Sequence, residues 1–148
     1  MTPANPAILR AGTWNIRWFP RGCPSNQACP DLTTDIPWLA CTIAWMNVDL
    51  LAIQEMLATP DAEFSLNSLR AELERLTGGS WQVDLHACGS PSTQHVGFLW
   101  KGARVALLQL TDVWELWHKK RNCLYHFPIF VTLLHDEVMD RLTSWHSL

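Results

Sequence analysis

Residues 48–53 are apolar at every position except Asp49, and two polar residues, Gln54 and Glu55, follow them directly. A short and almost wholly apolar run is typical of a strand that is covered on both faces in the middle of a sheet. Such a strand needs neighbouring strands at its sides and packed layers above and below. The run therefore predicts a layered domain in which Gln54 and Glu55 mark the carboxyl end of a central strand.

The residues before this run predict a strand followed by a helix. Residues 7–19 are expected to form a strand with its tryptophans on one face and Asn15 on the other, because side chains alternate along a strand. A helix is expected at about residues 35–47, and Thr34 or Asp35 can cap its first turn.

The residues after the run predict a second helix and three strands. The helix is expected at about residues 61–77, ending at Gly78, and the strands at 81–87, 95–101 and 104–113. The last two strands are expected to pair as a hairpin. This order of elements predicts an α+β fold, with a layered mixed β-sheet and helices on its outer face.

Composition limits the size of the molecule and the nature of its ligands. With 148 residues and 48% hydrophobic content, the chain is expected to form one domain. The net charge of −3 gives no overall field that attracts nucleic acid, so any recognition of phosphate must be local. The sequence has no apolar run of membrane-spanning length and no secretory signal, so we expect a cytoplasmic protein without a membrane partner.

Five cysteines are an odd number, and their spacings are not those of a zinc site. Cys23 and Cys29 are the only close pair, in a loop rich in proline and polar residues. They can bridge in an oxidising compartment, but we expect two reduced loop thiols, in keeping with a cytoplasmic location.

Two short motifs carry polar side chains at the ends of predicted strands. Trp14-Asn15 lies in the first strand and Gln54-Glu55 ends the central one. Their order, with an amphipathic helix between them, resembles the opening of the endonuclease/exonuclease/phosphatase family, whose members cut phosphodiester or phosphomonoester bonds with magnesium. The resemblance implies that Glu55 binds Mg²⁺, or Mn²⁺, and that Asn15 helps to hold the metal and the phosphate. By position alone, Glu55 would be read as a solvated glutamate at the start of a loop.

A third segment, residues 95–100, extends the resemblance from about residue 8 to residue 115. It resembles a strand of the family in which a polar residue precedes a glycine-containing apolar run, and it implies that His95 contacts the substrate phosphate. A histidine at the start of a strand is also an ordinary surface residue. The resemblance further implies half of a four-layer sandwich as the fold.

The later motifs of the family have no counterpart in this sequence. These are an Asp-x-Asn element that positions the nucleophile and a terminal Asp-His pair. Residues 124–134 form a β-prone run, residues 136–145 are expected to form a short helix, and residues 116–148 as a whole match the family poorly. We therefore expect one incomplete domain over residues 1–148.

These observations support three functional hypotheses. The first is a metal-dependent, nuclease-like phosphodiester hydrolase acting on nucleic acid or another phosphodiester substrate. The second is a catalytically inactive binding or interaction module that keeps the half-fold, suggested by the missing motifs and nine tryptophans. The third is a reading frame altered near residue 116, which would expose a sheet edge and lead to self-association.

Overall fold

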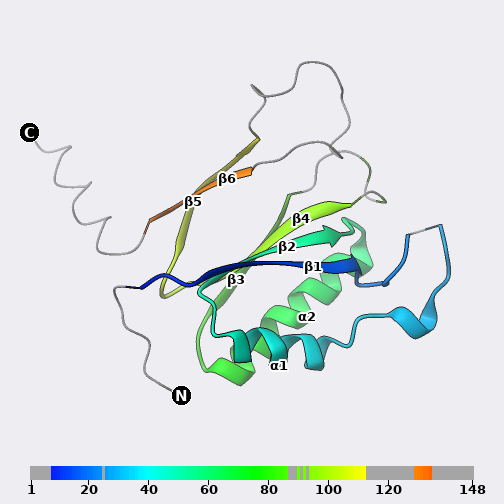
Figure 1. The fold of residues 1–148 in the computed structure, drawn as a ribbon, viewed down its shortest axis with the longest axis horizontal. Coiled ribbons are helices and arrows are strands. Elements are labelled where there is room, and N and C mark those ends of the chain that lie inside the picture. The colour runs from blue at the N-terminus through cyan, green and yellow to red at the C-terminus, as the bar shows by residue number, and fades with distance from the viewer. Residues whose placement is uncertain are drawn as a thin grey trace, which may run out of the picture.

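The computed structural model describes residues 8–24, 26–86, 90, 92, 94–112 and 129–134. Its centre is a four-stranded sheet in the order β1-β2-β4-β3 (Figure 1). The strands are β1 (Ala11–Phe19), β2 (Leu50–Met56), β3 (Trp81–His86) and β4 (His95–Lys101). β1 and β2 are parallel, whereas β4 is antiparallel to both β2 and β3. The predicted mixed sheet and the central position of β2 are confirmed.

Two helices cover one face of this sheet, and a second, smaller sheet lies on its other side (Figure 1). The α1 helix (Ile36–Met46) begins at Asp35, whose carboxylate accepts a hydrogen bond from the Trp38 amide at 3.0 Å. The α2 helix (Pro60–Thr77) begins after Thr59 and ends at Gly78, which takes a left-handed conformation. The predicted α+β class is confirmed, and the predicted helix boundaries agree with the structure to within one residue.

The central strand contributes to both sides of the core. Leu51 and Ile53 are fully buried between the sheet and the two helices. Leu50 and Ala52 pack on the opposite face, next to Phe98 of β4. Because β2 is covered on both faces, it has almost no polar side chain before Gln54, as the apolar run predicted.

The expected hairpin between residues 95–101 and 104–113 is wrong. β5 (Ala106–Asp112) pairs antiparallel with β6 (Ile129–Leu134) in a separate two-stranded sheet. The reason is that β4 already has β2 on one edge and β3 on the other, so no edge of β4 is left for β5. β6 falls within the β-prone run of residues 124–134, whereas the expected helix at 136–145 lies outside the described residues.

A disulfide closes the loop after β1, so the expectation of two reduced thiols in this loop is wrong. Cys23 and Cys29 form a disulfide, with Cα atoms 6.3 Å apart. The loop reverses at Gly22, whose φ is +73° and where a Cβ atom would collide with the Leu32 carbonyl oxygen. This turn and the short helix η1 (Pro30–Leu32) bring the two cysteines within bridging distance.

No helix in the described part of the chain is long and apolar enough to cross a membrane.

Candidate active site at the ends of two parallel strands

The structure brings Asn15 and Glu55 into direct contact. The side-chain nitrogen Nδ2 of Asn15 donates a hydrogen bond to Oε1 of Glu55 at 2.7 Å. The contact arises because β1 and β2 are parallel and paired in a register that sets Asn15 beside Gln54, so that their carboxyl ends meet at the same edge of the sheet. Beside this contact, Nε2 of Gln54 donates a hydrogen bond to the hydroxyl of Thr13, two residues before Asn15, at 3.2 Å.

The backbone departs from regular strand geometry at this contact. Regular alternation would place Glu55 on the face opposite Gln54, the helix-covered face to which Ile53 contributes. Glu55 instead has a φ of +61°, and the pairing of β1 with β2 shifts beyond Asn15. This left-handed turn lets the carboxylate reach Asn15, which lies between Trp14 and Ile16 in β1 and so points away from the helix-covered face against which these two pack.

Strained backbone gathers at the ends of both strands. Arg17 and Trp18, in the last part of β1, have φ values of +49° and +53°, alongside the +61° of Glu55. A non-glycine residue in the left-handed region costs about 1–2 kcal/mol. Three such residues at one edge of the sheet are typical of a functional site, because strain of this kind persists where the surrounding structure enforces a special geometry.

The amide of Asn15 is held at both ends. Its oxygen Oδ1 accepts a hydrogen bond from the Arg17 backbone amide at 2.9 Å, while Nδ2 points to the Glu55 carboxylate. Because Nδ2 carries two hydrogens, one donor remains for another acceptor nearby. The geometry therefore presents Asn15 to the site mainly as a hydrogen-bond donor, and the negative charge comes from Glu55.

The donor set at this edge fits magnesium. Mg²⁺ prefers oxygen ligands and is often held by only one or two protein carboxylates, with water and substrate phosphate filling the other positions. Within the described residues, no three His, Cys, Asp or Glu side chains gather in one place. The Glu55 carboxylate accepts one hydrogen bond, at Oε1, and Oε2 accepts none from the described residues.

His95 lies near the same end of the sheet but in a different environment. It pairs with Met56 at the start of β4, its side chain is buried, and its Nε2 is 3.0 Å from the Ser90 carbonyl oxygen. Alternation along β4 puts His95 on the side of Leu99, which packs toward the helices, whereas Asn15 is on the other face. The geometry favours a structural role for His95, and its contact with substrate stays a prediction.

Sequence reasoning gave no role to Asp49, which is 3% exposed at the opposite end of β2. Its carboxylate accepts hydrogen bonds from the Arg10 backbone amide at 3.0 Å and from Nζ of Lys101 at 3.3 Å, and it lies 3.8 Å from Nη2 of Arg104. A lone carboxylate inside an apolar run is the signal that could have identified it, since buried charges require partners.

The sequence matches no protein-family model and no curated protein. Among solved structures, it is similar to an endonuclease/exonuclease/phosphatase family protein from Bacteroides thetaiotaomicron (14% identity, TM-score 0.39, 52% of this chain). It is also similar to an endonuclease/exonuclease/phosphatase from Bacteroides vulgatus (16%, 0.45, 70%) and to the mannosyl-6-phosphatase Bt3783 of B. thetaiotaomicron VPI-5482 (13%, 0.45, 71%). The chain spans between 26% and 36% of the length of these three proteins.

Proposed function

We propose that the chain carries the metal-binding half of a phosphodiester hydrolase, acting on nucleic acid or another phosphodiester substrate. The observation that supports this most directly is the 2.7 Å contact between Asn15 and Glu55 at the carboxyl ends of two parallel strands. A carboxylate and an amide donor, fixed side by side in a strained backbone, form a pair that can bind a cation and a phosphate oxygen together.

The two residues have different tasks in this proposal. Glu55 holds Mg²⁺, or Mn²⁺, through its carboxylate, and the ion when bound supplies positive charge that neutralises the phosphate. Asn15 keeps the carboxylate in place through one N–H and has a second N–H to donate to a phosphate oxygen. Arg17 fixes the orientation of the amide through its own backbone N–H. Positioning and charge neutralisation are the main needs of phosphoryl chemistry.

The test is Mg²⁺-dependent cleavage of bis(p-nitrophenyl) phosphate and plasmid DNA by the wild type and by Glu55→Gln. Glutamine keeps the shape of the side chain and an oxygen that can accept from Asn15, but it removes the charge. We expect cleavage to fall by about 100-fold or more, the usual cost of removing one preorganised electrostatic group. Calorimetric titration with Mg²⁺ should show binding in the wild type and none in the variant.

Glu72→Gln is the matched control, because Glu72 lies on α2 and is engaged with Arg75 through two hydrogen bonds. It should bind Mg²⁺ and cleave both substrates like the wild type. If Glu55→Gln retains wild-type cleavage and Mg²⁺ binding, Glu55 has no part in the mechanism and the proposal fails.

A binding function without catalysis is the second candidate, and one observation favours it. The α1 helix has no charged residue, and it exposes Trp38 by 61% and Trp45 by 79%. Exposed tryptophans are common at protein interfaces. This candidate predicts no Mg²⁺ binding by the wild-type protein, so the same calorimetric titration separates the two functions.

A further inference from the structure

We propose that the outer edge of β3, together with the groove between β3 and α2, binds an extended peptide in which a basic side chain lies between two apolar ones. β1 and β3 are the two outermost strands of the four-stranded sheet, so this surface lies on the far side of the sheet from β1 and the Asn15–Glu55 pair. The proposal is therefore independent of the hydrolase function.

The pairing of β3 with β4 determines which backbone groups of β3 face outward. The Gly102 amide donates to the Ser80 carbonyl oxygen at 2.9 Å, so this pair of residues is in the hydrogen-bonded position of the antiparallel ladder. Alternation then turns the amides of Gln82 and Asp84 toward β4 and those of Val83 and Leu85 away from it. Among the described residues, no strand pairs with this outer edge.

One contact confirms this direction and limits the length of the open edge. The backbone amide of Trp81, two residues before Val83, donates to Oε1 of Glu74 at 3.1 Å and not to β4. Glu74 thus blocks the beginning of the edge. The amide and carbonyl groups of Val83 and Leu85 are left to receive an added strand of about three residues, by the pairing rule for antiparallel strands.

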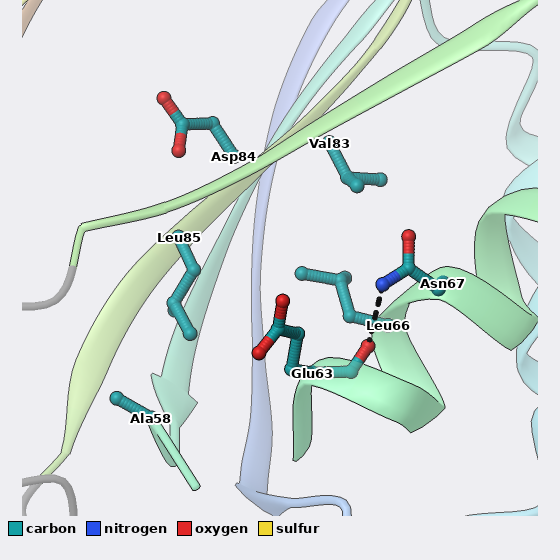
Figure 2. A pocket seen from close by; sticks show the side chains of 7 residues that line it. All are labelled: Ala58, Glu63, Leu66, Asn67, Val83, Asp84 and Leu85. Atoms are coloured by element: carbon teal, nitrogen blue, oxygen red, sulfur yellow. Dashed lines mark hydrogen bonds between the residues drawn. The ribbon is translucent and has the colours of Figure 1, made fainter. Parts of the chain in front are cut away.

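A groove of about 340 Å³ runs along this edge (Figure 2). Its lining combines apolar side chains with polar ones: Ala58, Glu63, Leu66, Asn67, Val83, Asp84 and Leu85. In Figure 2, Val83 points toward α2 while Asp84 points away from it. A strand lying beside β3 would therefore bring apolar side chains against Val83 and Leu85, in the manner of strand addition to a sheet edge.

The carboxylates that line the groove determine which side chain the peptide should carry between its two apolar side chains. Glu63 on the α2 side and Asp84 on the other face make no ion pair with the described residues. Because side chains alternate along a strand, the residue of the peptide level with Asp84 points to the same face as its carboxylate. A lysine or arginine there pairs with Asp84, and Glu63, on the α2 side of the groove, adds to the negative charge that attracts a positive peptide.

A second copy of this chain is a poorer occupant. The antiparallel register that uses the free groups of both Val83 and Leu85 is centred on Asp84. This register sets Asp84 directly opposite its copy, and like charges in that position destabilise a sheet. Charge complementarity therefore favours a basic peptide over self-pairing of β3.

The experiment measures fluorescence anisotropy with two peptides that carry fluorescein on the N-terminal amine, fluorescein-Ser-Val-Lys-Val-Ser amide and its counterpart with glutamate in place of lysine. We expect the wild type to bind the lysine peptide at least about 10-fold more tightly, a difference typical of one charge contact at an interface. Asp84→Lys should reverse the preference. Asp31→Lys, which changes an exposed acidic residue on η1, should behave like the wild type.

Two further measurements keep the result interpretable. Hydrogen exchange followed by NMR should show slower exchange of the Val83 and Leu85 amides, and not of Gln82 or Asp84, when the lysine peptide is bound. Asp84→Asn, which keeps the shape of the side chain, should lose the preference if Asp84→Lys does not fold. Equal binding of the two peptides, or a β3-mediated dimer that excludes the lysine peptide in sedimentation experiments, would overturn the proposal.

Discussion

The two carboxylates at the ends of β2 differ in almost every respect. Asp49, just before the strand begins, is 3% exposed and is surrounded by the Arg10 amide, Lys101 and Arg104. Glu55, near the strand's end, is half-buried, has a single side-chain donor, and takes a left-handed backbone conformation. Asp49 thus stabilises the fold through several partners at the start of β2, whereas Glu55 holds a charge near the end of β2 in a conformation that lowers stability.

The partners of Asp49 show why its end of the strand is stable. Its backbone amide donates to the Arg10 carbonyl oxygen at 2.7 Å, and its carbonyl oxygen accepts from the Lys101 amide at 2.9 Å. Backbone and side chain of one residue thereby join the start of β1, the start of β2 and the end of β4. Nothing of this kind surrounds Glu55 within the described part of the chain.

The largest expected effect is the loss of this junction. Asp49→Asn leaves Lys101 and Arg104 partly buried without their counter-ion, and we expect it to lower the free energy of unfolding by about 3 kcal/mol. Glu55→Gln should change the free energy of unfolding by less than about 0.5 kcal/mol, because it removes no buried partner. Urea denaturation followed by tryptophan fluorescence measures both values.

A similar loss in the two variants would break the comparison, since it would mean that both carboxylates contribute equally to the fold. Asp31→Asn, which changes an exposed acidic residue, serves as the baseline for the denaturation experiment.

A smaller effect should reveal the strain at Glu55 itself. Glycine takes a positive φ without the steric cost that a Cβ atom brings, so Glu55→Gly should be more stable than Glu55→Ala by about 1 kcal/mol. Thermal unfolding of the two variants in the same buffer gives the difference. At Leu51, in the middle of the same strand, the order must be the reverse, with Leu51→Ala the more stable of the two.

The smallest expected effect concerns an ion pair at the Glu55 end. Arg21 in the loop after β1 and Asp61 at the start of α2 are 3.0 Å apart, with side chains that are 43% and 49% exposed. The Thr59 hydroxyl, and then Arg21, lower the pKa of Asp61 below its ordinary value of 3.8. The pair therefore stabilises the fold above pH 3.8 and loses this contribution as the pH falls through the lowered pKa.

For the exposed pair we expect a contribution of at most about 1 kcal/mol, reduced further by salt. Comparing Asp61→Asn with the wild type in urea at neutral pH and at pH 3 measures it. The difference in stability between the two proteins should shrink toward acid pH, and a difference that grows would contradict this expectation.

Local patterns were enough to predict the elements around β2. The apolar run, the Asp35 cap and the glycine after α2 each act over a few residues, so the sequence displays them directly. The carboxyl ends of β1 and β2 meet because the two strands are parallel neighbours. The contact between Asn15 and Glu55 also needs the positive φ of Glu55, which no local pattern of the sequence shows.

What could not be predicted depends on contacts between distant residues. The sequence predicted that β5 pairs with β4, which was wrong. The short connection between β4 and β5 favours a hairpin, and it does not show that β2 and β3 already occupy both sides of β4. The side of the sheet on which His95 lies was also hidden, since residues 96–100 are apolar on both faces and show no alternation. Lys101, a partner of Asp49, lies 52 residues further along the chain.

The left-handed backbone at Glu55 links the direction of its carboxylate to the chirality of the amino acid. A D-residue introduced at this position by chemical synthesis would find the same backbone angles relaxed, because they are the mirror image of the right-handed region. In a D-residue the side chain and the α-hydrogen exchange places on the Cα atom, so the carboxylate would point away from Asn15. Relief of the strain and loss of the contact are therefore inseparable at this position.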